Sequence, residues 1–386
     1  MGRLRVLVGA GAISYNRPRV SDLSAIRSVP KVELHQHVDG SIPVELTWEL
    51  MKRHRLNPVP DREQMENLLV LQEAEEGTLL RYLDKFHYPL WITQFYDNIA
   101  LVTEAIVEQA HQQGVRLLEL RYSPLIHTYA GLTVRQAISA ALHGMNVARR
   151  RLTELRCGLV VIAMRHHGPH IAKLLARQAI SEADYLHDKT GVVGFDIAGA
   201  ERGNPPSLFR EAYEIARRGG LGLTAHAGED EGPACLWQAV DDLGVDRIGH
   251  ACSAVQDKEL MRRLARDQIL VECCITSNYQ TGAVAPGEHH PIHKFLDMGI
   301  PVAVCTDNTT VSKTDQTREN GRLVKELGLV AIGELHRRAE EHSFLNRRSV
   351  PAAGPATTVP PADAGGGRRS PSAAAGGTGS QRRRRT

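Results

Sequence analysis

The stretch KVELHQHVDG, residues 31–40, joins a short apolar run to three reactive side chains, His35, His37 and Asp39. Side chains two positions apart in a β-strand point to the same side, so a strand here would direct both imidazoles to one face. In a closed barrel of parallel strands that face is the barrel axis, and such barrels carry their chemistry at the carboxyl ends of the strands. The stretch therefore predicts the first strand of a barrel with two histidines at its mouth.

Seven further runs share the short length and the apolar, β-branched character of this strand. Amphipathic stretches such as 133–152 and 207–219 lie between most of them and have helical spacing. Eight strand–helix repeats in about 280 residues predict an α/β fold, a (β/α)8 TIM barrel, with an open doubly wound sheet as the competing fold. The eight runs are KVELH (31–35), VRLLELRY (115–122), GLVVIAM (158–164), GVVGFDI (191–197), LGLTAH (221–226), DRIGH (246–250), QILVECC (268–274) and PVAVCT (301–306).

The interval between the first two runs, residues 44–114, is long. It carries several helical patterns, including PVELTWELMKRH and TLLRYLDKFHYPLW. We interpret this segment as a helical lid insertion after the first strand, placed over one mouth of the barrel.

Composition divides the chain into an N-terminal lead-in (1–28), a (β/α)8 domain (29–348) and a tail (349–386). The tail consists mainly of Pro, Ala, Gly, Ser, Thr and Arg, and this predicts disorder because it has almost no apolar surface to bury. Its six arginines and one aspartate account for more than the whole net charge of +3, so the rest of the chain is slightly acidic. The charge of the domain therefore gives no case for nucleic-acid binding.

The cellular setting is predicted from what the chain lacks. No stretch approaches the roughly 20 apolar residues that a membrane span needs, and the first twenty residues resemble a signal peptide only weakly. Six scattered cysteines without a CxxC pair favour reduced, mostly buried thiols. We expect a cytoplasmic protein with neither a membrane nor a nucleic-acid partner, and the sequence leaves its oligomeric state open.

Polar residues end several of the other predicted strands. The fifth run finishes at His226, the sixth finishes at His250, and the eighth is followed by Asp307. Burying such side chains unpaired inside a barrel is costly, whereas convergence on one cation would stabilise them. Three neutral imidazoles and one carboxylate suit Zn²⁺ or another divalent transition metal, with an open position at which a water is activated.

Two residues near these strand ends, Glu229 and His250, are candidates for proton transfer. Glu229 lies in the turn after His226, where shielding from water would keep it protonated as a general acid. On spacing alone it could instead be a helix-entry residue near Asp230 and Glu231. His250 could orient the activated water or take its proton.

The motifs together resemble the adenosine deaminase family of the amidohydrolase superfamily. The resemblance covers about residues 31–345 and rests on motifs that occur in the order of the family. They are KVELHQHVDGSIP, LELRYSP (118–124), MRH (164–166), HAGE (226–229), GHA (249–251) and TDN (306–308).

The resemblance implies a metal site and a reaction. One Zn²⁺ per chain would be held by the set His35, His37, His226 and Asp307. Glu229 would protonate the purine ring nitrogen beside the reacting carbon, C6, and His250 would position the hydroxide that attacks it. Adenosine or deoxyadenosine would give inosine or deoxyinosine plus ammonia. The predicted fourth strand lacks the bridging lysine of binuclear relatives, which favours one metal.

The resemblance also implies residues that bind a small purine nucleoside. Gly199 would present its backbone amide to the far side of the purine, and Asp39 would contact the ribose end. Asn308 stands where the family usually has a second aspartate, which contacts the purine imidazole nitrogen. An Asn amide donates a hydrogen bond without needing a proton, so recognition is preserved in principle. The sequence NTTVSKT that begins at Asn308 also departs from the family, and the closing helix looks shortened.

Alternative functions share most of these residues. An aminodeoxyfutalosine deaminase or an adenine deaminase would read the same ring, whereas AMP is disfavoured because no basic cluster accompanies the motifs. A non-catalytic nucleoside-binding relative is the alternative from another class, although every expected site residue except the second aspartate is present. The histidines of GEHHPIHKF, residues 287–295, lie beside Gly287 and Pro291, which predicts a surface loop after the seventh strand rather than a metal site.

Overall fold

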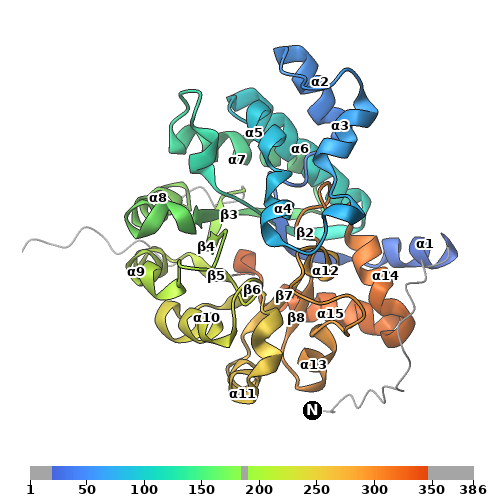
Figure 1. The fold of residues 1–386 in the computed structure, drawn as a ribbon, viewed down its shortest axis with the longest axis vertical. Coiled ribbons are helices and arrows are strands. Elements are labelled where there is room, and N and C mark those ends of the chain that lie inside the picture. Colours follow the sequence, from blue (N-terminus) through green and yellow to red (C-terminus); the bar gives the residue numbers. More distant parts are fainter. Residues whose placement is uncertain (1–19, 184–189, 347–386) are drawn as a thin grey trace, which may run out of the picture. The chain divides into compact units, whose positions relative to one another are not determined.

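The computed structural model describes residues 20–183 and 190–346, which build one sheet of eight parallel strands surrounded by helices (Figure 1). The strands neighbour one another in chain order. They are β1 Lys31–His37, β2 Val115–Tyr122, β3 Arg156–Met164, β4 Val192–Ala198, β5 Gly222–Ala227, β6 Arg247–His250, β7 Leu270–Cys273 and β8 Val302–Val304.

The sheet closes between its first and last strands. Gln36 of β1 forms a parallel bridge with Asp307, just beyond β8. The backbone N–H of His37 donates to the Asp307 carbonyl at 2.7 Å, and the N–H of Asp307 donates to the His35 carbonyl at 2.9 Å. The predicted (β/α)8 TIM barrel is therefore confirmed, and the open doubly wound sheet is excluded.

Helices cover the outside of the barrel, and α7 illustrates how the sequence specifies them. At its start the Thr133 hydroxyl accepts from the Gln136 N–H, and the Gln136 side chain accepts from the Thr133 N–H. This reciprocal pair satisfies backbone donors that the first turn leaves free. The barrel helices are α6 Tyr96–Gln112, α7 Val134–Arg151, α8 Gly168–Ala183, α9 Arg210–Arg218, α10 Pro233–Gln238, α11 Lys258–Asp267, α12 Ile275–Gln280, α13 Ile292–Asp297, α14 Gln316–Leu327 and α15 Leu329–Glu341.

The predicted helical insertion lies between β1 and β2. Leu71 and Tyr82 from this insertion form a small buried cluster with Val311, and the Tyr82 hydroxyl lies 2.7 Å from the Ser312 hydroxyl. Both partners follow β8, so the insertion packs on the side where the strands end. Its helices are α2 Val44–His54, α3 Arg62–Leu69, α4 Leu79–Asp84 and α5 His87–Ile92, before α6.

The ends of the predicted domain are only partly described. Helix α1, Val20–Ser28, falls within the predicted lead-in and buries Ile26. Residues 1–19 and the predicted disordered tail, 349–386, lie outside the described residues.

In the part that the structure describes, no helix combines the length and the apolar character needed to cross a membrane. All six cysteines are buried and free, as predicted.

The end of the barrel opposite its mouth is filled by one aromatic side chain. A Cβ added at Gly222 of β5 would lie 2.1 Å from a ring carbon of Phe344, and one at Gly194 of β4 would lie 2.6 Å from the same ring. The guanidinium carbon of Arg247 lies 3.5 Å from the ring centroid. Two glycines therefore leave the room that Phe344 occupies, and this segment completes the core beyond α15.

Replacing Phe344 with Ala should lower the free energy of unfolding by about 3–5 kcal/mol, since it empties a packed site between two strands. Chemical denaturation measures this loss. Phe95→Ala is the matched control, because Phe95 is 38% exposed and should lose clearly less. Equal losses in the two variants would contradict the structural role assigned to Phe344.

Candidate active site

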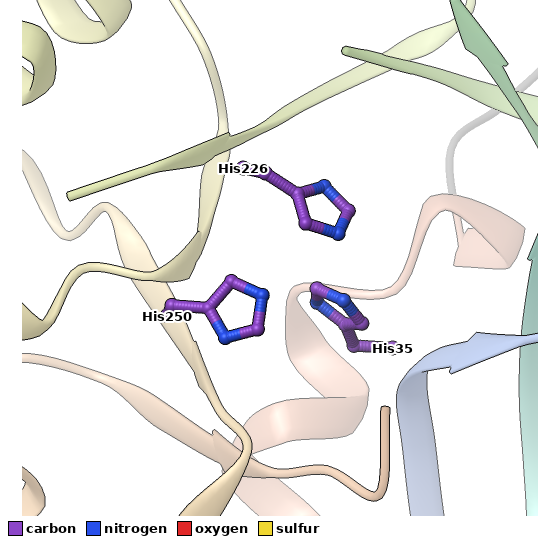
Figure 2. A group of neighbouring side chains, drawn as sticks. All are labelled: His35, His226 and His250. Atoms are coloured by element: carbon purple, nitrogen blue, oxygen red, sulfur yellow. The ribbon is translucent and has the colours of Figure 1, made fainter. Parts of the chain in front are cut away.

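The predicted site residues come from separate strands and meet at the carboxyl ends of the barrel strands. His35 and His37 belong to β1, His226 to β5 and His250 to β6, whereas Asp307 follows β8. Figure 2 shows the rings of His35, His226 and His250 turned toward one another. His35 and Asp307, which are 272 positions apart in the chain, thus share one small volume because the barrel is closed.

The ring nitrogens of the histidines converge closely. His37 Nε2 lies 3.3 Å from His35 Nε2 and 3.1 Å from His226 Nε2. Asp307 Oδ1 lies 3.3 Å from His37 Nε2 and 3.6 Å from His35 Nε2. The structure therefore brings together all four residues that were predicted as metal ligands.

Two buried carboxylates determine which nitrogen of each ring faces the cluster. His35 Nδ1 donates to Glu272 at 2.8 Å, and His226 Nδ1 donates to Asp196 at 3.0 Å. With the proton on Nδ1, the Nε2 of each neutral ring directs a lone pair at the centre of the cluster. Lone pairs that face one another need a cation between them, so the donor set fits a metal ion.

The charges around His35 lead to the same conclusion. Burial and Arg121 oppose a charge on this ring, but Asp307 and Glu272 outweigh them and raise its pKa. The surroundings therefore favour positive charge at this point, as a bound cation would supply. Cys274 also lies within reach of Asp307 and His250. Burial raises its pKa well above the ordinary value, and a protonated thiol is a poor ligand.

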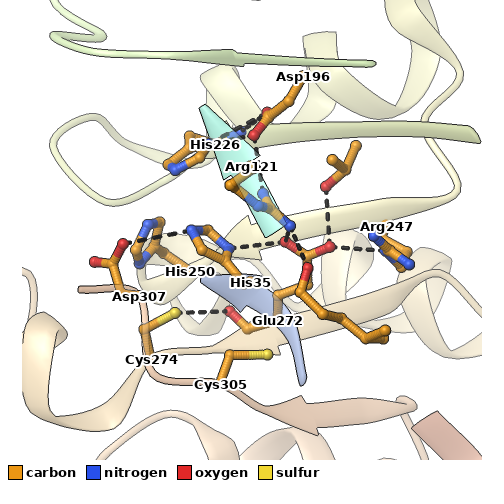
Figure 3. Close-up of polar contacts among 12 residues, drawn as sticks. His35, Arg121, Asp196, His226, Arg247, His250, Glu272, Cys274, Cys305 and Asp307 are labelled. Carbon is orange, nitrogen blue, oxygen red and sulfur yellow. Dashed lines mark hydrogen bonds and ion pairs between the residues drawn. The ribbon is translucent and has the colours of Figure 1, made fainter. Parts of the chain in front are cut away.

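A buried network of ion pairs supports the two carboxylates (Figure 3). Arg121 donates to Asp196 and to Glu272, both at 2.9 Å, and Arg247 donates to Glu272 at 2.7 Å and to Glu119 at 2.6 Å. All five side chains are fully buried. None of these residues was among the predicted site residues, although single charged residues inside apolar runs such as VRLLELRY and QILVECC were a usable signal.

Left-handed backbone marks two residues of the site. His250 has φ 66° and Asp307 has φ 60°, a region that few residues other than glycine adopt. Each residue lies where a strand ends, so the kink directs its side chain into the barrel mouth. The Ser277 hydroxyl donates to Asp307 Oδ2 at 2.6 Å and fixes the orientation of the carboxylate.

The environment of Glu229 favours its protonated form. Burial raises the pKa of this carboxyl well above its ordinary value, and the nearby carboxylates of Asp307 and Glu201 raise it further. The turn is held in place because the N–H groups of Gly228 and Glu229 both donate to Glu201 at 3.0 Å. One oxygen of Glu229 lies 3.5 Å from His250 Nε2. These surroundings therefore favour the neutral carboxyl beside the histidine cluster, which the helix-entry interpretation does not account for.

The three predicted substrate-binding residues lie around the same mouth. Asp39 is buried and accepts a hydrogen bond from His127 Nε2 at 2.8 Å, a partner that the sequence did not reveal. Gly199 follows β4 with φ 91°, which favours glycine. Asn308 donates from its amide nitrogen to Asp307 at 2.7 Å, and a Cβ added at Gly40 would lie 2.0 Å from its amide oxygen.

A model of the family described as adenosine deaminase matches residues 30–350. The chain belongs to the adenosine deaminase family. It is 35% identical to the adenosine deaminase of Clostridium kluyveri over 303 residues, which cover 78% of this chain and 84% of that protein. It is also 35% identical to a probable adenosine deaminase of Dictyostelium discoideum, over 75% of this chain but only 37% of that protein.

Solved structures give the same assignment. The adenine deaminase from Arthrobacter aurescens superposes with a TM-score of 0.74 at 26% identity, covering 82% of this chain and 94% of that one. Arabidopsis ADAL complexed with IMP superposes with a TM-score of 0.71 at 26% identity, covering 83% and 93%. One of these neighbours is named an adenine deaminase and the other is complexed with IMP, and the present chain is an enzyme of the deaminase class.

Replacing Glu272 with Gln should lower the free energy of unfolding by about 3–5 kcal/mol, because two buried arginines lose a charged partner. Denaturation of metal-free protein measures this loss without any contribution from a cofactor. Glu334→Gln, which removes a solvent-exposed partner of Arg337, is the control and should change stability little. A Glu272→Gln protein as stable as the wild type would contradict the role of the buried network.

Proposed function

We propose that the protein hydrolytically deaminates adenosine or deoxyadenosine, giving inosine or deoxyinosine and ammonia. The observation that carries the proposal is the buried Glu229 carboxyl, whose pKa burial raises, beside a converging cluster of imidazoles. Attack of water on a purine ring requires a proton donor for the ring nitrogen and an activated water. Relatives named adenosine deaminases, at up to 35% identity, support adenosine as the substrate.

The cofactor of the proposed reaction is one Zn²⁺ per chain, held by His35, His37, His226 and Asp307. Its support is the set of Nε2 lone pairs and the carboxylate that face one another, with Glu272 and Asp196 behind two of the rings. Three nitrogens and one oxygen are a common zinc ligand set. When bound, zinc lowers the pKa of a coordinated water, so that an oxygen nucleophile forms at neutral pH.

The side chains of the site would perform the remaining steps. Glu229 would give its proton to the ring nitrogen beside the carbon that bears the amino group, which makes that carbon more electrophilic. His250 would hold the attacking oxygen in position. The proton still on the added oxygen would pass to the amino group, which leaves as ammonia, and the proton lost by the attacking water would restore Glu229, so adenosine and water give inosine and ammonia.

Recognition of the substrate would involve Asp39, Gly199 and Asn308. We propose that the Gly199 amide and the Asn308 side chain bind the purine and that Asp39 binds the ribose. A buried carboxylate at the ribose end would repel a phosphate, which favours a nucleoside over a nucleotide such as the IMP bound by Arabidopsis ADAL. The helical insertion would act as the lid, because it contacts the loop that begins at Asn308.

The wider organisation is also part of the proposal. We infer a lead-in over 1–28, a catalytic domain over 29–348 and a Pro/Ala/Gly/Arg-rich tail over 349–386. A cytoplasmic location agrees with six free, buried cysteines.

The decisive experiment adds the purified protein to adenosine, deoxyadenosine, adenine and aminodeoxyfutalosine in parallel and follows the absorbance change of the 6-amino to 6-oxo conversion. We expect fast conversion of adenosine or deoxyadenosine, about one zinc per chain, and loss of turnover on chelation that added Zn²⁺ restores. Faster conversion of adenine or aminodeoxyfutalosine would replace the proposed substrate. Absence of turnover with all four compounds in zinc-loaded protein would contradict the proposed function.

Glu229→Gln should lower kcat by about 100- to 10,000-fold, because an amide cannot protonate the ring nitrogen. Zinc content should stay at the wild-type level, since Glu229 is not a proposed ligand. Glu231→Gln is the matched control: it lies two residues away and forms an ion pair with the exposed Arg202, so its kcat should match the wild type. Normal turnover by Glu229→Gln would show that the proton comes from another group.

A further inference from the structure

His250 stands at one end of a chain of hydrogen bonds that leads away from the site. Its Nδ1 lies 2.9 Å from the amide nitrogen of Asn278 in α12. The amide oxygen of Asn278 lies 3.0 Å from Nε2 of His290, and Nδ1 of His290 lies 3.1 Å from the backbone nitrogen of Ile292 in α13. All three side chains are buried, so no solvent competes for these contacts.

The backbone N–H of Ile292, at the far end of this series, sets the direction of every hydrogen bond between it and His250. A backbone N–H can only donate, so His290 Nδ1 accepts from Ile292 and the His290 ring carries its proton on Nε2. That N–H donates to the Asn278 oxygen, which turns the Asn278 NH₂ group toward His250. Because the NH₂ group donates, His250 Nδ1 accepts, and the proton of the neutral His250 ring lies on Nε2.

The neutral state of His290, which this order requires, is favoured by its surroundings. Burial lowers the pKa of the His290 ring to about 3, helped by the nearby His293 and Arg322. A charged His290 would present two N–H groups, and one of them would then face the N–H of Ile292. The neutral ring with a single acceptor at Nδ1 is therefore favoured at neutral pH.

We propose that Asn278 and His290 are positioning residues that hold His250 in its Nε2–H form, so that His250 offers a hydrogen-bond donor, and not a base, to the oxygen that attacks the purine. The identity of that oxygen rests on the proposed function, whereas the form of the ring follows from the hydrogen bonds alone. A neutral ring with its proton on Nε2 has no lone pair there. His250 therefore orients the nucleophile and does not take its proton.

A second buried pair has the same arrangement away from the site. The Val32 N–H donates to His336 Nδ1 at 3.2 Å, His336 Nε2 donates to Asn320 at 3.0 Å, and the Asn320 amide donates to the Gln316 carbonyl at 2.7 Å. This hydrogen-bond chain ends on Gln316, through its backbone carbonyl and its side-chain oxygen, whereas the one through Asn278 ends on His250 of the candidate active site. Asn320 thus offers a matched control for changes at Asn278.

The test is Asn278→Asp in the full-length protein. A carboxylate only accepts hydrogen bonds, so it would keep the N–H of His290 and require another N–H from His250, which moves the His250 proton from Nε2 to Nδ1. Two-bond ¹H–¹⁵N correlation spectra of protein labelled with ¹⁵N-histidine report which nitrogen is protonated. The signals of His250 are assigned by their loss in His250→Gln.

We expect His250 to be protonated on Nε2 in the wild type and on Nδ1 in Asn278→Asp, with kcat lower by about 10- to 100-fold in the variant, the usual cost of losing such a supporting contact. Asn320→Asp should leave both the His250 signals and kcat unchanged. These results together would support the proposal.

Three results would overturn it. One is a wild-type spectrum with the proton on Nδ1, which decides the matter even if the variants do not fold. Another is Asn278→Asp with the proton still on Nε2, and the third is an equal effect of Asn320→Asp. If no purine is turned over, the proposed function fails, while the spectra still decide the form of His250.

Discussion

The structure depends on one buried carboxylate, Glu272, held between Arg121 and Arg247 in the interior of the barrel. An ionised carboxyl inside a protein is costly unless it is paired, and the two guanidinium groups hold its pKa well below the ordinary value. Because it stays ionised, it accepts a hydrogen bond from the Nδ1–H group of His35 and thereby turns Nε2 toward the site. Asp196, which shares Arg121, does the same for His226. Fold stability and the orientation of the site therefore rest on the same charges.

Closure of the barrel and formation of the site likewise depend on the same residue, Asp307. The backbone of Asp307 bonds to the strand that carries His35 and His37, and its side chain faces the nitrogens of both rings. The left-handed backbone at Asp307 permits both contacts at once. A strand that closed one residue out of register would lose the last hydrogen bonds of the sheet and would also misplace the carboxylate.

Behind these residues, the site is ordered by hydrogen bonds whose direction is fixed by groups that can only donate or only accept. The carboxylates of Glu272 and Asp196 place protons on Nδ1 of His35 and His226, whereas the amide of Asn278 leaves Nδ1 of His250 without one. The histidine rings at the barrel mouth therefore carry their protons on different nitrogens, Nδ1 in His35 and His226 and Nε2 in His250. Two present lone pairs, as metal ligands require, and one presents a donor.

The sequence by itself determined the eight strands, the insertion between the first two, and the reactive residues at the strand ends. These follow from local signals, because apolar runs and the spacing of side chains along a strand are set by neighbouring residues. Strand bounds were close: the run predicted at 191–197 is β4, Val192–Ala198, while the run at 301–306 shortens to β8, Val302–Val304, as the chain bends toward Asp307.

Only the tertiary structure decided which side chains support that site. Arg121 and Glu272 are 151 positions apart, and His127 reaches Asp39 across 88. Such partners carry no local pattern, because their contact exists only after the barrel closes. The histidines of 287–295 looked like a surface loop, yet His290 is buried against Asn278, since the turn before α13 folds back toward the mouth. Composition and periodicity define the strands, but pairing of buried polar groups depends on three-dimensional proximity.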